Sequence, residues 1–128
     1  MRQTAISILK RTTLASALVL LTAGTAVSAD NFGAIAFSQA TGGYGYSYDH
    51  ATRSQAESRA MAECRSRNRG CKVAIWFKNA CGAVATGSNN GWGSAWAGSR
   101  DRAERAAIGY CRQHTNNCRV LAWTCTSR

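Results

Sequence analysis

The sequence predicts an α+β fold, a single disulfide-stapled domain of two pseudo-symmetric β-β-α-β units with two helices packed on one sheet. Three observations predict it. Strand-like and helix-like segments follow in the same order twice, the hydrophobic content of 45% suffices for a packed core, and the chain of 128 residues holds six cysteines. The repeat consists of matching residue types: residues 33–36 with 82–85, residues 43–45 with 91–93, Cys64 with Cys111, Cys71 with Cys118, and Trp76 with Trp123.

Residues 1–29 are predicted to be a cleaved secretory signal peptide that stands outside the fold. Three basic residues precede the apolar residues 14–21, and the small side chains of residues 27–29 place cleavage before Asp30. The apolar run is shorter than the roughly 18 residues of a membrane span. We therefore expect a secreted or periplasmic protein in which residues 30–128 form one domain.

The first unit, about residues 32–81, is expected to contain two strands, a helix and a third strand. The apolar residues 33–38 form the first strand, and three tyrosines at period two mark the second. Residues 55–65 lack glycine and are rich in helix formers, and Thr52 and Ser54 both stand at capping-box spacing from Gln55 and Glu57. Two further local signals complete this unit: a helix face with Ala56, Ala60 and Cys64, and a strand over residues 72–77 that follows a left-handed turn at Gly70.

The second unit, about residues 82–128, repeats this plan. Strands are expected over residues 82–86, 92–97 and 119–124, with a helix over residues 101–112. The helix face that should be buried is fuller than in the first unit: Ala103, Ala106, Ala107, Tyr110 and Cys111. The small side chains on both helices predict a close approach of helix to sheet.

The six cysteines indicate a disulfide framework in an oxidising compartment. Six cysteines allow many pairings, but the repeat narrows them, because in each unit one cysteine closes the helix and another opens the next strand. We predict the pairs Cys64–Cys71, Cys111–Cys118 and Cys81–Cys125. Chain entropy assigns about 2.5 kcal/mol to each short loop and about 4 kcal/mol to the long one, which we expect to link the two units. Zinc is disfavoured because no two cysteines stand two to four residues apart in sequence.

The strongest charge feature is a cluster of basic residues at the end of the first helix and in its loop. The chain has 16 Lys and Arg against 6 Asp and Glu, for a formal net charge of +10, and therefore favours anionic partners. We interpret the cluster as a binding patch for an anionic partner: Arg59, Arg65, Arg67, Arg69 and Lys72. The alternative is that these cations complement the helix dipole on a solvated face.

The aromatic residues allow two interpretations. Trp76 and Trp123 occupy equivalent strands among β-branched neighbours and are expected in the core. For the other strand aromatics, packing on the sheet face is favoured over a stacking platform beside the basic loop. That second group is Tyr44, Tyr46, Tyr48, Trp92 and Trp96.

The sequence contains no convincing set of catalytic residues, and we expect that the protein is not an enzyme. His50 and His114 occupy different positions of the repeat, and no G-x-S-x-G nucleophile motif is present. Glu57 and Glu104 are explained as equivalent capping-box residues, and no carboxylate pair sits in an apolar setting that would raise a pKa. A small secreted hydrolase that uses His50 or His114 stays an alternative, as does a periplasmic inhibitor or immunity protein that acts against a lytic enzyme.

Several of these segments resemble a known family of bacterial secreted domains, the domain of unknown function 4189. The resemblance covers the chain after the signal peptide and is carried by residues 33–38, 43–48, 71–77 and 79–85 and by Cys118-Arg119-Val120. It implies export and a disulfide-containing domain, in a family some of whose members are linked to pathogen–host interaction, but it implies no catalytic residues. We therefore expect a non-enzymatic binding domain without cofactor or metal. Its partner is expected to be an acidic protein or an anionic envelope or membrane surface, with nucleic acid less favoured.

Overall fold

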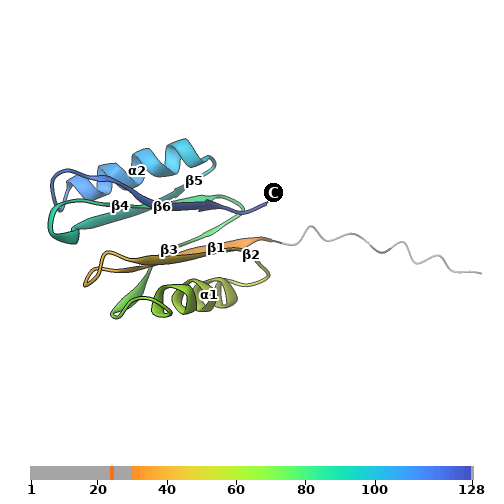
Figure 1. The fold of residues 1–128 in the computed structure, drawn as a ribbon. Helices are drawn as coiled ribbons and strands as arrows, with labels where there is room; N and C mark the ends of the chain where they lie inside the picture. The colour runs from red at the N-terminus through yellow and green to blue at the C-terminus, as the bar shows by residue number, and fades with distance from the viewer. Residues whose placement is uncertain (1–23, 25–29, 128) are drawn as a thin grey trace, which may run out of the picture.

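The computed structural model describes residue 24 and residues 30–127, so the predicted signal peptide, apart from residue 24, lies outside the described residues. The elements follow the predicted order twice (Figure 1). The first unit consists of β1 (Phe32–Ser38), β2 (Tyr44–His50), α1 (Arg53–Arg65) and β3 (Cys71–Lys78). The second consists of β4 (Cys81–Thr86), the short helix η1 (Ser88–Asn90), β5 (Trp92–Ala97), α2 (Arg100–Arg112) and β6 (Arg119–Cys125).

The α+β class is confirmed, but the expectation of one sheet is wrong. Each unit builds its own three-stranded antiparallel sheet, in the orders β2-β1-β3 and β5-β4-β6. The two sheets face each other, and α1 and α2 lie on the two outer faces, which gives four layers (Figure 1). The physical reason is that both faces of the central strands need cover. On β1, Ala34 and Ala36 pack against α1, whereas Ile35 and Phe37 pack against the other sheet.

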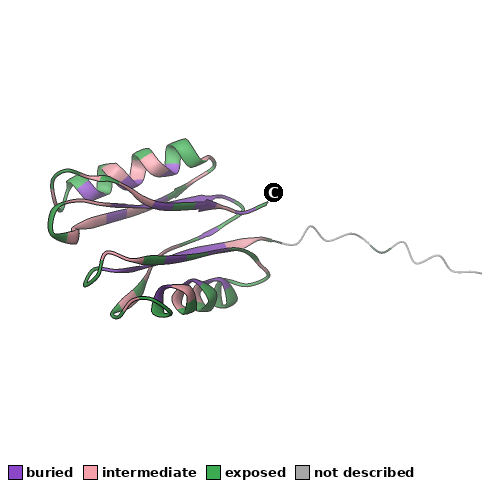
Figure 2. Cartoon of the chain, viewed as in Figure 1, coloured by how far each residue is buried: buried purple, intermediate pink, exposed green. Residues whose placement is uncertain are grey.

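The core accordingly has three parts, which Figure 2 shows as buried stripes along the central strands and the inner helix faces. Small residues fill the space between each helix and its sheet, as the sequence predicted for Ala56, Ala60 and Cys64. Larger side chains meet between the sheets. On α2 the buried face is narrower than predicted, since Ala106 is only half-buried and Tyr110 is exposed.

Both helices begin at hydroxyl caps. Thr52 accepts a hydrogen bond from the backbone N–H of Gln55, and Ser99 accepts one from that of Arg102. The predicted capping-box role of Glu57 and Glu104 is wrong, because the helices begin too early for either residue to reach the cap. Each of these glutamates instead pairs with an arginine one turn earlier, which is the usual i,i+4 geometry.

The structure contains the three predicted disulfides: Cys64–Cys71, Cys111–Cys118 and Cys81–Cys125. The first and second tie the end of each helix to the start of the following strand. The third was expected to link the units, but Cys81 is the first residue of β4 and lies opposite Cys125 of β6. It therefore staples the second sheet to itself.

The two ends of the molecule are built from different parts of the chain. The four turns that follow β1, α1, β4 and α2 gather at one end, and the start of β1 and the end of β6 lie at the other (Figure 1). At the terminal end the Asp30 carboxylate accepts from Lys78 and Asn79, and these hydrogen bonds lower its pKa below the usual value. The Asp49 carboxylate accepts from the backbone and the hydroxyl of Ser127. Within the described part of the chain, no helix is long and apolar enough to cross a membrane.

Candidate functional site

The tyrosines of β2 lie on the surface, on the side of the strand turned away from α1. Gly45 and Ser47 are buried against the helix, and Ser47 donates its hydroxyl hydrogen to the carbonyl of Ala56. By the two-residue period of a strand, the alternate residues project to the other side. Tyr44, Tyr46 and Tyr48 are between 37 and 53% exposed. The three tyrosines are therefore outside the core, and the alternative of a stacking platform stays a prediction.

A basic stripe of α1 runs beside this row. Arg59 and Glu63 stand one turn apart, directly beside the buried stripe of the helix, and form an ion pair of 2.7 Å. Arg67 continues the stripe one turn further, just past the helix end. The tyrosine row and this stripe line one open cavity of about 540 Å³, which we call the tyrosine–arginine cavity. Its lining residues are Tyr44, Gly45, Tyr46, Ser47, Tyr48, His50, Arg59, Glu63 and Arg67.

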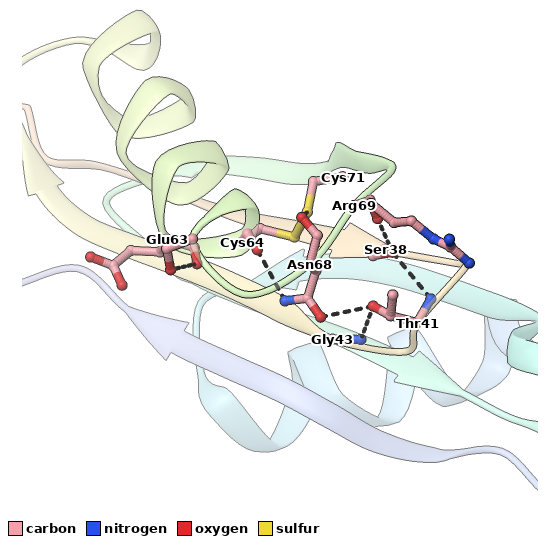
Figure 3. Close-up of a disulfide and its surroundings, with 9 residues drawn as sticks. Ser38, Thr41, Gly43, Glu63, Cys64, Asn68, Arg69 and Cys71 are labelled. Carbon is pink, nitrogen blue, oxygen red and sulfur yellow. Dashed lines mark hydrogen bonds between the residues drawn. A yellow bond between two sulfur atoms is a disulfide. The ribbon is translucent and has the colours of Figure 1, made fainter.

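The loop that carries Arg67 is held by the first disulfide and by a chain of hydrogen bonds (Figure 3). The Asn68 side chain donates to the Cys64 carbonyl and accepts from the Thr41 hydroxyl. Ser38, itself buried, donates its hydroxyl hydrogen to the Arg69 carbonyl. Gly70 adopts the predicted left-handed conformation, with φ of 68°. The backbone on both sides of Arg67 is thereby fixed before any partner binds, which lowers the entropic cost of binding.

The second unit provides an internal comparison for this cavity. The equivalent position beside β5 and α2 also forms a cavity, of about 460 Å³. The buried stripes of the two helices align Arg59 with Ala106, Glu63 with Tyr110, and Arg67 with His114. The fold thus forms a cavity at the equivalent place of the second unit without arginines. We conclude that the arginine pair of the first unit is not required by the architecture.

The structure brings together two of the five predicted binding residues. Arg59 and Arg67 line the cavity, whereas Arg65 lies on another flank of α1 with Met61 and Val73. The Arg69 side chain extends from the loop away from the disulfide (Figure 3). The Lys72 ammonium lies 4.8 Å from the centre of the Trp92 ring. The five residues are all exposed, and of the cavities described here Arg59 and Arg67 line one and Arg65 lines another.

Two tryptophans depart from their predicted place in the core. Trp76 and Trp123 are 38 and 39% exposed. Each lies opposite an alanine, Ala34 or Ala83, that packs against the helix, so the ring sits on the helix side of its sheet. There an arginine covers it. The guanidinium of Arg53 is 4.3 Å from the Trp76 ring centre, and that of Arg100 is 3.7 Å from the Trp123 ring centre.

This stacked arrangement occurs in both units, with Glu57 and Glu104 holding the two arginines. It is therefore explained by the fold. Trp76 also lines a larger and more apolar groove of about 680 Å³ together with Trp96, which is 61% exposed. That groove contains none of the five predicted binding residues. Trp92 is only half-buried and packs against Phe37 across the two sheets, with 5.7 Å between ring centres.

All six carboxylates of the sequence are engaged within the described residues. Five form ion pairs with lysine or arginine, and the sixth, Asp49, accepts two hydrogen bonds from Ser127. The two histidines lie apart, each beside the free edge of a different sheet. Across residues 30–127, no group of three or more His, Cys, Asp and Glu side chains gathers in a geometry that could hold a metal ion.

Fold and site together define a small, duplicated, disulfide-stapled α+β domain with one basic, tyrosine-lined cavity. The chain belongs to the family described as Domain of unknown function (DUF4189), whose profile matches residues 32–125. A similar solved structure is the NMR structure of Rv1813c from Mycobacterium tuberculosis, at 24% sequence identity and a TM-score of 0.55. The similarity covers 96% of this chain and 99% of that chain, and it shows the fold alone. A comparison with curated proteins finds no match.

Sequence reasoning named neither Glu63 nor His50 as a binding residue, and considered His50 only as the catalytic residue of an alternative hydrolase, although both line the cavity. A signal for the cavity was nevertheless present. Where the two helices are aligned by their buried alanines, most positions repeat in kind, but Arg59, Glu63 and Arg67 face Ala106, Tyr110 and His114. A difference between copies of a duplicated unit marks residues that the shared fold does not need.

Proposed function

We propose that this protein is an exported, non-enzymatic binding domain that holds an acidic segment of a partner protein in the tyrosine–arginine cavity. One observation carries the proposal. Of two equivalent cavities in a duplicated fold, only one is lined by Arg59 and Arg67. Because the fold forms the other cavity without them, binding is the better explanation for the arginine pair.

The chemistry of the cavity suits a carboxylate. A guanidinium is planar, always charged, and able to donate two parallel hydrogen bonds to one carboxylate. Arg67 forms no ion pair with the residues that the structure describes, so its donors are available to a partner. The tyrosines add broad, rigid contact surfaces and hydroxyl groups at low entropic cost. A ligand in this cavity therefore meets both charge and aromatic surface.

Export is supported by the cysteines and by the predicted signal peptide. All six cysteines are paired, and disulfides persist mainly in oxidising compartments such as the periplasm or the extracellular medium. The partner would then be a protein of the cell envelope or of a host. A role as a secreted effector in pathogen–host or symbiont–host interaction would need a further delivery step after export through the Sec pathway.

We propose that the protein is not an enzyme because its carboxylates are all engaged with neighbouring residues. Acid–base chemistry requires groups whose pKa values are tuned by burial or by close like charges. Here five of the six carboxylates neutralise a neighbouring cation and the sixth holds Ser127. If the protein were instead a hydrolase, His50→Ala or His114→Ala would abolish a measurable turnover. If it were an inhibitor or immunity protein, it would form a tight complex with a lytic enzyme.

The proposal is tested by titrating the oxidised, isotope-labelled protein with a short Asp- and Glu-containing peptide and following its amide NMR signals. We expect shifts at β2 and at the end of α1. The double variant Arg59→Ser/Arg67→Ser should bind at least about tenfold more weakly, because a hydrogen bond to a charged group contributes about 1.5–3 kcal/mol. Affinity should also fall as salt rises, since the contacts are exposed.

A matched control removes the same charge elsewhere. Arg102 and Arg112 are exposed on α2 and line none of the cavities described above, so Arg102→Ser/Arg112→Ser should bind nearly as well as the unchanged protein. Equal losses in the two double variants would reduce the effect to net charge and overturn the assignment of the cavity. Binding to vesicles of anionic phospholipid or to single-stranded DNA, with no binding of the acidic peptide, would replace the proposed partner class.

A further inference from the structure

The tyrosine–arginine cavity lies along a free sheet edge. In the order β2-β1-β3, β2 pairs on one side with β1 alone, in unbroken register from Ala34 opposite Ser47 to Phe37 opposite Tyr44. No other strand of the described chain pairs with its outer side. An antiparallel edge strand directs the N–H and C=O groups of every second residue outward, where they can pair with another chain.

Most of this edge, residues 44–48, lacks the usual protection against such pairing. Natural edges are blocked by charged side chains, by proline or by bulges. The outer strands β3 and β6 follow that rule, since they carry Lys72, Lys78 and Arg119 and their pairings contain register shifts in the middle. By contrast, residues 44–48 contain no charge and no proline, and both the one acidic residue of β2, Asp49, and the one register shift in its pairing lie near the end of the strand.

The β5 edge is also uncharged and regular, so exposure alone does not favour β2 over β5 as the place where a partner binds. The residues that flank the two edges distinguish them. Beside β5 the cavity is lined by no lysine or arginine, whereas beside β2 it is lined by Arg59 and Arg67 together with a single acidic residue, Glu63. An acidic chain is therefore attracted to the β2 edge and not to the β5 edge.

We propose that an extended, acidic segment of a partner protein adds to the free edge of β2 as a fourth strand of the first sheet. The inference rests on the proposed function and specifies the bound conformation. Successive side chains of a strand point to opposite faces. One set would therefore meet the tyrosine row, and the other would meet Arg59 and Arg67 on the side of α1. The sequence that fits best alternates acidic residues with aromatic or β-branched ones.

The experiment uses a peptide of about six residues, a usual strand length, that alternates Asp with Val or Tyr. Two N-methylated forms are compared with it, one for each set of alternate backbone nitrogens. The form methylated on the side that faces β2 should bind roughly tenfold more weakly or worse, because it loses several backbone hydrogen bonds. The other form should bind like the parent peptide. In the parent complex, hydrogen exchange of the outward amides of β2 should slow.

The outcomes separate this inference from the proposed function. If both methylated peptides bind like the parent while Arg59→Ser/Arg67→Ser still loses affinity, the strand addition is wrong and the acidic binding site stands. If no peptide binding depends on the arginines, both fall. Protection of β5 amides in place of β2 amides would also overturn the inference. Both arginines are exposed, and a dispersed amide spectrum of the double variant verifies that it folds.

Discussion

At the scale of single residues, two glycines of the sheets set the distance between helix and sheet, because they carry no side chain. A Cβ atom on Gly45 would lie 2.4 Å from the amide nitrogen of Cys64 and 2.5 Å from the carbonyl oxygen of Ala60. The equivalent Gly93 would bring its Cβ to 2.2 Å from the amide nitrogen of Cys111. These neighbours are backbone atoms of a helix, which cannot move aside singly. The close packing of α1 and α2 therefore requires glycine at both positions.

We expect Gly45→Ala to destabilise the oxidised protein by about 1–3 kcal/mol, the usual cost of inserting a methyl group into a filled space. The helix must move away from β2, which also loosens the contacts of Ala56 and Ala60 with the sheet. Urea denaturation followed by circular dichroism measures the free energy of unfolding. Because Arg59 stands on this helix and Arg67 stands in the loop that follows it, affinity for an acidic peptide should fall as well.

Gly109→Ala serves as the control for this change. Gly109 is exposed within α2, and a Cβ there meets no atom within 4 Å. Alanine loses less backbone entropy than glycine on entering a helix, so this variant should gain about 0.5–1 kcal/mol. A loss of stability in Gly109→Ala comparable with that in Gly45→Ala would show that the glycine-to-alanine exchange itself, and not the helix contact, is responsible.

At the scale of elements, the three disulfides act on segments of very different length. Cys64–Cys71 and Cys111–Cys118 each join residues 7 apart in sequence, whereas Cys81–Cys125 joins residues 44 apart. A bridge restricts the unfolded chain more when it closes a longer loop. The short bridges shape the turns after the helices, and the long bridge determines how far the second unit can expand on unfolding.

We expect the double variant Cys81→Ser/Cys125→Ser to lose about 4 kcal/mol and Cys64→Ser/Cys71→Ser about 2.5 kcal/mol. The two values follow from loop length, and the measurement is urea denaturation of each variant with its other disulfides intact, checked by intact mass. The urea dependence should steepen most for the first variant, because its unfolded chain exposes more surface. A larger loss for the short bridge would contradict the loop-length argument.

Elements were predicted well where local signals agree. The helices and strands begin and end within two residues of the predicted limits, because period-two tyrosines, hydroxyl caps and glycine turns are local features. The aromatic side chains were predicted less well. Trp76 and Trp123 lie among β-branched neighbours, yet an arginine from the start of the helix of the same unit covers each ring. Such a partner depends on packing between elements, which strand patterning does not contain.

At the scale of the whole molecule, Phe77 joins the two sheets. It is buried between them with Ile35 and Val84, and its ring fills the space above two equivalent glycines. Cβ atoms on Gly33 and Gly82 would lie 2.4 and 2.3 Å from its ring. The equivalent residue of the second unit is Thr124, so this contact has no symmetric counterpart. A side chain of one unit thus stabilises the other.

We expect Phe77→Ala to cost about 3–5 kcal/mol, a large share of the stability of a small domain, because the sheets cannot close over the cavity. Thermal unfolding followed by circular dichroism measures it. Phe32→Ala is the control: Phe32 is only half-buried, at the rim beside Trp76, and should cost clearly less. Equal costs would argue against a special role for Phe77 between the sheets.

The sequence by itself determined the class of fold, the duplicated order of elements, the three disulfide pairs and the excess of positive charge. All of these depend on residue types, on spacing along the chain, or on comparison of the two repeats. The sequence also indicated that Arg59 and Arg67 belong to a basic segment.

Only the tertiary structure decided that two sheets face each other, that the tyrosines stay exposed, and that two of the five basic residues share a cavity with them. The physical reason is that burial on both faces of β1 and β4 is a balance between distant elements. Once α1 covers one face and the second sheet covers the other, β2 is left at an edge, where its tyrosines line one cavity together with Arg59 and Arg67.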